Sequence, residues 1–211
     1  MKRLTLILAL LLTLVGLSGR AQSFEGGLMA GAVTSQINGD GRGGFHQLGW
    51  TGGVFGRIPT SGPTSWQLEM KYTLLGARSS VDEIEAGIAP MDIRLHYVEV
   101  PVMFRYRLSN FQEPLDFITL EIGLSADFLA KNSQSAYNDG GFENPSWLFF
   151  SVTGNIGVQF DINERLGVNI RSMNSLTPCR WNLESPSIFY GHLYNIALQA
   201  GLTYTILAPG R

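Results

Sequence analysis

Charged side chains recur inside stretches of the chain that are otherwise apolar. They fall at alternate positions, as Glu69 and Lys71 do, so on extended strands they would all point to one face. Carboxylates in such a pattern could form an acid–base pair or line an ion path. Acidic and basic members are equal in number, however, and an unpaired charge away from water is very unfavourable, which favours mutual salt bridges. We therefore expect a structural polar network formed by Arg57, Glu69, Lys71, Tyr97, Glu99, Arg105, Glu121, Asp127 and Arg171.

The three histidines, His46, His96 and His192, are the next candidates for chemistry. The alternation puts each of them near the end of a different strand and on the outward face. A shared metal ion needs ligands within about 2 Å. These strands are not neighbours, and even adjacent strands lie about 4.8 Å apart. The sequence therefore predicts no metal site and no cofactor.

A lipid-modifying hydrolase is the enzyme class that we weighed. His192, Ser172 and Ser175 would lie near the same rim on neighbouring strands, and such hydrolases need a Ser and a His within hydrogen-bond reach. No motif fixes this trio, and the chain contains no G-x-S-x-G, no H-E-x-x-H and no phosphate-binding loop. We expect a non-enzymatic protein without catalytic residues.

Strands are the elements that would position these residues, because apolar and polar side chains alternate with a period of two. The alternation is strict over residues 66–74, 118–128 and 194–205, and weaker over 24–34, 48–58, 97–108, 150–161 and 165–173. The strict stretches reach about ten residues, the length that a tilted strand needs to cross a bilayer. The pattern predicts eight antiparallel strands, an even number as in bacterial outer-membrane barrels.

Short and long connections alternate between these strands. The short ones are residues 59–65, 109–115 and 161–164, and the long, polar ones are 35–46, 76–92, 130–147 and 174–189. Outer-membrane barrels have short periplasmic turns and long outer loops, an asymmetry that a secreted β-sandwich, the main alternative, has no reason to show. Aromatic residues near strand ends suit interfacial girdles: Trp50, Trp66, Trp147, Phe149, Phe150, Tyr190 and Tyr204. The sequence predicts an all-β, eight-stranded, up-and-down transmembrane barrel with four long outer loops.

The first residues have the three parts of a secretory signal. Lys2 and Arg3 precede an apolar run of about fourteen residues, shorter than the roughly 20 of a spanning helix. Gly19 and Ala21 then form a cleavage site before Gln22. We expect residues 1–21 to be a cleaved Sec signal peptide and residues 22–211 to form the barrel domain in the outer membrane.

The net charge and the cysteine content exclude one class of partner and one kind of crosslink. Removing residues 1–21 takes away Lys2, Arg3 and Arg20 and no acidic residue, so the net charge changes from −2 to −5. This acidic balance argues against a nucleic-acid partner. Cys179 is the only cysteine, so it cannot form an internal disulfide and is expected to be a free thiol.

The segment His96-Tyr97-Val98-Glu99-Val100-Pro101 resembles the Tyr-x-Glu-aliphatic-Pro segment of the PorT family, small outer-membrane barrels abundant in Bacteroidota. The resemblance spans about residues 22–206 and includes an early Gly-rich strand and the segment Trp66-Gln67-Leu68-Glu69-Met70-Lys71-Tyr72. It implies an eight-stranded barrel in the outer membrane, and the founding member is linked to type IX secretion. Within the segment, Pro101 predicts a bulge or bend. Many barrels end on an aromatic residue, whereas this chain continues past Tyr204 into Leu-Ala-Pro-Gly-Arg.

These observations predict a protein that sits in outer-membrane lipid and has a structural or binding role through its outer loops. Protein partners are expected at the outer loops or the periplasmic turns, and the resemblance implies secretion machinery among them. Two other functions stay open at this point. One is a narrow transport pore, and the other is an enzyme that modifies lipids in the outer leaflet.

Overall fold

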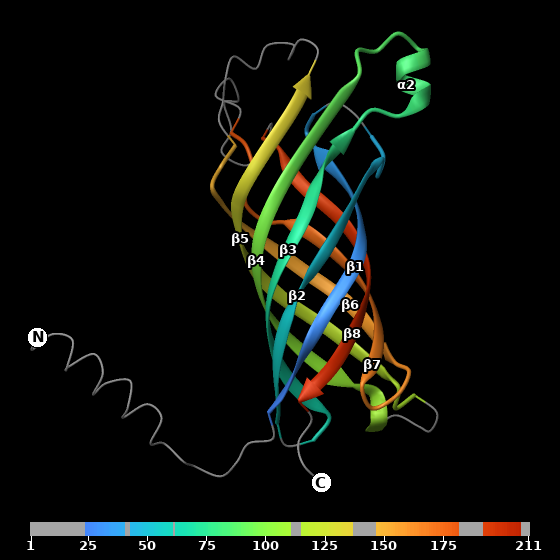
Figure 1. Cartoon of the computed structure of the whole chain (residues 1–211), viewed down its shortest axis with the longest axis vertical. Helices are drawn as coiled ribbons and strands as arrows, with labels where there is room; N and C mark the ends of the chain where they lie inside the picture. Colours follow the sequence, from blue (N-terminus) through green and yellow to red (C-terminus); the bar gives the residue numbers. More distant parts are fainter. Residues whose placement is uncertain are drawn as a thin grey trace, which may run out of the picture.

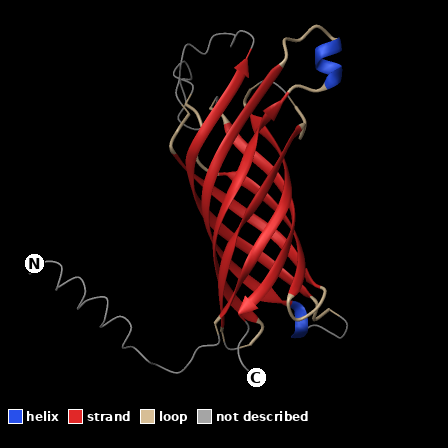
Figure 2. Ribbon diagram, in the orientation of Figure 1, coloured by secondary structure: helices blue, strands red, loops and turns tan. Residues whose placement is uncertain are grey.

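Eight strands close into a barrel in the computed structural model, which describes residues 24–40, 43–60, 62–110, 115–136, 147–181 and 192–207. Every strand pairs antiparallel with the next, and β8 pairs with β1 to close the sheet (Figures 1 and 2). The strands are β1 (Glu25–Asn38), β2 (Gln47–Pro59), β3 (Thr64–Arg78), β4 (Met91–Arg107), β5 (Ile118–Ala136), β6 (Phe150–Asp161), β7 (Leu166–Ser175) and β8 (Tyr194–Leu207). The predicted all-β, eight-stranded, up-and-down barrel is thus confirmed.

The expected signal peptide, residues 1–21, lies outside the described residues. In the part of the chain that is described, no helix has both the length and the apolar character needed to cross a membrane.

The two ends of the barrel carry different connections. β1 begins and β8 ends at the same end, which also holds the connections 60–63, 108–117 and 162–165 (Figure 1). We call this the inner end. The opposite end, which we call the outer end, holds the connections 39–46, 79–90, 137–149 and 176–193, and these include the longest in the chain.

An apolar belt covers the outside of the barrel between these ends. Two aromatic pairs mark its borders: Trp66 and Phe104 toward the inner end, with ring centroids 5.3 Å apart, and Trp50 and Tyr72 toward the outer end, 5.4 Å apart. On β5 the belt runs from Ile118 to Phe128, about 24 Å along the barrel axis for a strand tilted by roughly 45°. That height suits the hydrocarbon core of a bilayer. Exposed members of the belt include Leu68, Met70, Ile122, Leu124, Ile156 and Leu202. Of the aromatic residues expected in girdles, Trp147 instead packs on the interior cluster described below, and Tyr190 lies outside the described residues.

Beyond the belt, toward the outer end, the polarity of β3, β4 and β5 is reversed. Here Arg78, Arg94 and Lys131 are exposed on the outward face. The inward face carries a buried apolar cluster, which we call the outer plug: Val33, Ile37, Leu75, Ala77, Ile93, Leu95, Tyr97, Met173, Cys179, Leu193 and Ala197. This arrangement is what a strand shows when its outer face meets water rather than lipid.

The reversal explains why four predicted strand boundaries were wrong. β1, β3 and β5 were expected to end at residues 34, 74 and 128, but they continue to Asn38, Arg78 and Ala136, and β4 begins at Met91 rather than at residue 97. The predicted strands extend only as far as apolar residues occupy the outward positions. Where water replaces lipid, the inward positions become apolar, so the same strand no longer fits that pattern.

The expected bulge at Pro101 is not found. Pro101 pairs with Ser125 of β5, and the register of β4 against β3 is the same on both sides of it, although the pairing positions at Val100 and Pro101 are missing. The register shift on β4 lies between His96 and Tyr97 instead, where β5 carries an extra residue. Proline removes one hydrogen-bond donor without shifting the strand here.

One short α-helix, α2 (Val81–Glu85), lies in the connection between β3 and β4, and a 3₁₀ helix, η1 (Leu108–Asn110), follows β4. The sequence analysis did not predict α2. A signal was present, because Ser80 and Glu83 form a capping box: the Glu83 amide donates to Ser80 Oγ at 3.1 Å, and the Ser80 amide donates to Glu83 Oε2 at 2.9 Å.

Candidate functional site

Arg171 of β7 lies at the centre of the barrel interior and bonds to two carboxylates from other strands. Its Nη1 and Nη2 donate to Glu69 of β3 at 2.8 and 2.9 Å, a two-pronged contact. Nη2 also donates to Glu121 of β5 at 2.9 Å. All three side chains are shielded from solvent. One guanidinium therefore ties together strands from opposite sides of the barrel.

The network continues from this centre toward the inner end along two branches. On one branch, Arg105 Nε donates to the second oxygen of Glu121 at 2.8 Å. On the other branch, Gln67 Nε2 donates to Glu69 at 2.7 Å, and Gln67 Oε1 accepts from Arg57 Nε at 2.9 Å. Hydrogen bonds thus link the middle of the interior to Arg57 and Arg105 near the inner opening.

A second group of charges lies closer to the outer end. Lys71 Nζ is 3.0 Å from Glu99 Oε2 and donates to Gln199 Oε1 at 2.9 Å. Asp127 pairs with Glu99 across neighbouring strands and accepts hydrogen bonds from the hydroxyls of Ser125 and Thr153. The Glu99 carboxylate has no hydrogen bond of good geometry from a described residue. Its contact with Lys71 is therefore an electrostatic one.

Tyr97 marks the upper limit of the polar interior. Its hydroxyl accepts a hydrogen bond from Asn195 at 3.1 Å, while its ring belongs to the outer plug. The structure thus buries all of the residues expected in the network, but it groups them into two sets of charges with Tyr97 above them. The outer plug itself was not expected. Its sequence signal is a set of apolar residues at the inward positions, such as Val33, Ile37, Ile93 and Leu95.

The three histidines lie in different surroundings, although all of them were expected on the outward face. His46 is exposed, and His96 Nδ1 is 2.8 Å from the Tyr72 hydroxyl on the outward face. His192, which was expected to point outward, is buried and packs edge-on against Trp181, with ring centroids 4.5 Å apart. Its neighbour Leu193 forms a β-bridge with Arg180, which brings the described ends of this connection together. The described residues contain no group of three His, Cys, Asp or Glu side chains placed to hold a metal ion.

The Ser–His trio considered for a hydrolase is divided between the two faces of the barrel wall. Ser172 lies on the outward face and accepts a hydrogen bond from Asn174 Nδ2 at 3.1 Å. His192 is in the interior, and the Ser175 hydroxyl has no hydrogen-bond partner among the described residues. No observation therefore favours a nucleophilic site here.

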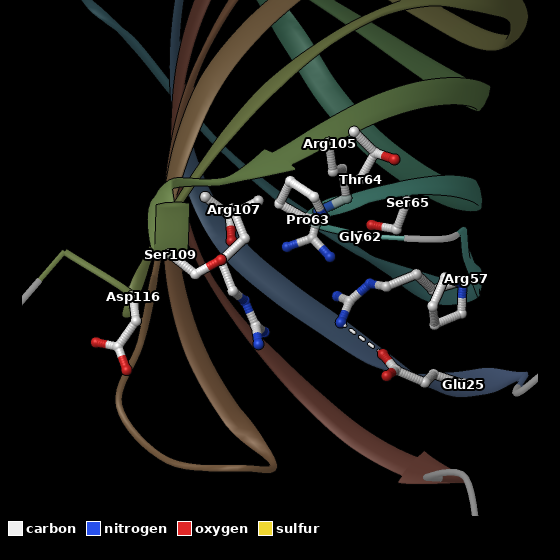
Figure 3. A pocket seen from close by; sticks show the side chains of 12 residues that line it. Glu25, Arg57, Gly62, Pro63, Thr64, Ser65, Arg105, Arg107, Ser109 and Asp116 are labelled. Atoms are coloured by element: carbon white, nitrogen blue, oxygen red, sulfur yellow. Dashed lines mark hydrogen bonds and ion pairs between the residues drawn. The ribbon is translucent and has the colours of Figure 1, made fainter. Parts of the chain in front are cut away.

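A polar pocket of about 550 Å³ opens at the inner end, directly below the central network (Figure 3). Its walls include three arginines, Arg57, Arg105 and Arg107, with Glu25 and Asp116. Arg57 Nη1 donates to Glu25 at 2.8 Å, and Arg107 Nη2 donates to Asp161 at 3.0 Å. We call this pocket the inner mouth. Sequence reasoning placed Arg57 and Arg105 in the network but missed Arg107 and Glu25, which lie at the ends of strands.

Comparisons with known proteins give one matching family and several similar solved structures. The family described as "Outer membrane protein beta-barrel domain" matches residues 18–179. Among solved structures, the chain is similar to Ail, the attachment invasion locus protein of Yersinia pestis, with 13% sequence identity over 86% of this chain and 98% of that chain and a TM-score of 0.47. It is also similar to the outer membrane protein OprG from Pseudomonas aeruginosa, with 10% identity over 88% of this chain and 95% of that chain and a TM-score of 0.40. None of the curated proteins matches the sequence.

Proposed function

Because the chain belongs to the family of outer membrane protein β-barrel domains, we propose that it is a closed, non-enzymatic barrel whose outer connections bind a protein partner. The family places the protein in outer-membrane lipid, which the apolar belt would contact. The proposal concerns what the barrel does there.

The filled interior supports binding rather than transport. An eight-stranded barrel is just wide enough for its own side chains to fill the lumen. Here large side chains do so at two levels: Arg171 and Glu69 in the middle, and Leu95, Ile37 and Tyr97 in the outer plug. Apolar side chains at the outer level offer no ligands to an ion that has left water. A narrow transport pore is therefore not the function that the interior favours.

The observation that carries the proposal is the exposed apolar surface of α2. Val81, Ile84 and the nearby Ile88 are 70, 47 and 45% exposed, and no residue of α2 is buried. The helix stands away from the barrel at the outer end (Figure 1). Apolar side chains grouped on a projecting element beyond the lipid belt mark an interaction site, because their exposure to water is unfavourable until a partner covers them.

The charges on α2 indicate the chemistry of that partner. Asp82, Glu83 and Glu85 lie in the same short helix as Val81 and Ile84, and the last turn of the helix holds no basic residue. Anionic lipid headgroups would be repelled by this surface. A protein with an apolar groove and a basic rim is complementary to it. We infer that α2 docks into such a protein.

Site-specific photo-crosslinking in intact cells tests this function. A photoreactive residue in place of Ile84 should give one discrete protein adduct, and the same residue at Ile162, an exposed apolar position at the inner end, should not give that adduct. Reversing the charges with Asp82→Lys and Glu85→Lys should abolish the adduct. No adduct at Ile84, or an adduct that survives charge reversal, would contradict the proposal.

We propose in addition that the chain is a PorT-type barrel. Support comes from the segment Tyr97-x-Glu99-Val100-Pro101, because Tyr97 and Glu99 both face the interior, as its alternation requires. On this assignment the partner would be a component of secretion machinery. Mass spectrometry of the Ile84 adduct tests it: a partner with no link to secretion would contradict the secretion role while leaving the binding function intact.

A further inference from the structure

We propose that the inner mouth binds an oxyanion, a carboxylate or a phosphate group, presented from the periplasmic side. The inner mouth is separate from α2 and lies at the other end of the barrel, so this proposal is independent of the binding function above.

Three arginines direct hydrogen-bond donors into the same pocket. Figure 3 shows the side chains of Arg57, Arg105 and Arg107 in the wall of the same pocket, with Asp116 set apart from them. Each guanidinium has five N–H donors, and a planar fork of such donors matches the oxygens of a carboxylate or phosphate.

Many of these donors are not used by the protein itself. Toward the described residues, the Arg105 side chain donates through Nε alone, to Glu121, and the Arg107 side chain through Nη2 alone, to Asp161. Arg57 uses Nε and Nη1, for Gln67 and Glu25. The Nη2 atom of Arg57 and both terminal nitrogens of Arg105 donate to no described residue. These atoms keep some accessible surface, and both arginines line the pocket, so the unused donors can reach a ligand there.

The donors are held in place before any ligand arrives. Arg57 and Arg105 are more than nine-tenths buried, and the Arg57 guanidinium lies over the Phe55 ring, 5.1 Å from its centroid. Arg105 is anchored through Glu121 to Arg171. Ser65, which pairs with Arg105, has a small side chain that leaves space next to it. Side chains fixed in this way lose little entropy when they bind an anion.

Each arginine of the inner mouth already pairs with one carboxylate of the protein: Arg57 with Glu25, Arg105 with Glu121 and Arg107 with Asp161. The case for an anion therefore rests on the guanidinium donors that these pairs leave unused. The hydroxyls of Ser65 and Ser109 lie in the same wall and can donate to further oxygens. The pocket volume, about 550 Å³, would hold a small anion or the end of a peptide.

Calorimetric titration of the full chain in lipid nanodiscs tests the site with two probes. Inorganic phosphate represents a small free anion, and tri-alanine with a free carboxyl end, compared with its carboxyl-amidated form, represents a peptide terminus. We expect saturable binding of phosphate, of the free-carboxyl peptide, or of both, and no binding of the amidated peptide. The preferred probe identifies the source of the oxyanion.

Arg107→Gln is the main variant, because Arg107 is exposed and its loss should leave the barrel folded. It should weaken binding by at least about tenfold, since a hydrogen bond to a charged group is lost. Arg94→Gln, which removes an exposed arginine at the outer end, is the matched control and should bind like the wild type. The proposal is overturned if neither probe binds saturably up to about 10 mM, or if the two variants weaken binding equally.

Discussion

Replacing Arg171 by Met leaves the carboxylates of Glu69 and Glu121 in the barrel interior without the cation that lies between them. Arg171 donates three hydrogen bonds of 2.8–2.9 Å to these two groups, and none of the three side chains is accessible to bulk solvent. Removing one partner of a buried ion pair costs about 3–5 kcal/mol. That is a large share of the roughly 5–15 kcal/mol that stabilises a folded domain. We therefore expect Arg171→Met to lower the free energy of unfolding by about 3–5 kcal/mol.

Urea unfolding of the barrel in lipid vesicles, followed by tryptophan fluorescence, measures this change. Arg94→Met is the control, because it breaks the exposed ion pair with Asp92, which contributes little, and it should unfold at nearly the wild-type urea concentration. Adding Glu69→Gln to Arg171→Met removes one uncompensated charge, while Glu121 keeps its pair with Arg105, so this double variant should recover part of the lost stability. An Arg171→Met barrel as stable as the wild type, or no recovery in the double variant, would refute the reasoning.

Three further predictions concern the wall, the N-terminus and the thiol. A cysteine at Leu68 should react with lipid-soluble probes and one at Glu69 should not, since these side chains face the belt and the interior; the reverse result would place the apolar face inside. N-terminal sequencing of the protein extracted from outer membranes should begin at Gln22, and a chain that still carries residues 1–21 would contradict cleavage. Burial raises the pKa of the Cys179 thiol from 9.0 to about 12. Cys179 should therefore resist maleimide at pH 8 until the protein unfolds. Between pH 9 and 12 the unfolded chain loses this proton while the folded one keeps it, so stability should fall as pH rises, and Cys179→Ala should remove that part of the fall.

The strands of the belt could be predicted from the sequence because a single rule governs them. Their outward face meets lipid and their inward face carries paired charges, so Leu68 and Glu69 have opposite character at adjacent positions. The outer parts of β3, β4 and β5 follow a different rule, because water replaces lipid around them. Leu75 and Leu95 therefore point inward, at the same alternate positions that Lys71 and Glu99 occupy nearer the inner end. No local pattern in the sequence shows where this change from charged to apolar residues takes place.

The same alternation predicted which charged side chains point inward, but not which partners they meet there. Arg171 meets Glu69 and Glu121, which lie on strands that are not neighbours of β7 and therefore reach it across the lumen. Such contacts depend on the stagger between strands, which small shifts of register set. His192 was misplaced for a related reason, since the bridge between Arg180 and Leu193 lies outside the strands and cannot be predicted from strand alternation.

The residues of the inner mouth could not all be predicted from the alternation of apolar and polar side chains. Arg107 and Glu25 lie at strand ends, where alternation no longer distinguishes a lumen position from a turn. Only closure of the barrel brings them to the same opening as Arg57 and Arg105.

Planar-bilayer recording of the purified wild-type barrel tests the central claim, a closed interior, most directly. The outer plug and the charged groups below it fill the lumen, so we predict no steady current under an applied potential, and Glu99→Ala should mainly lower stability. A steady, ion-selective conductance in the wild type, lost in Glu99→Ala without loss of stability, would contradict the account and make transport the function of the barrel.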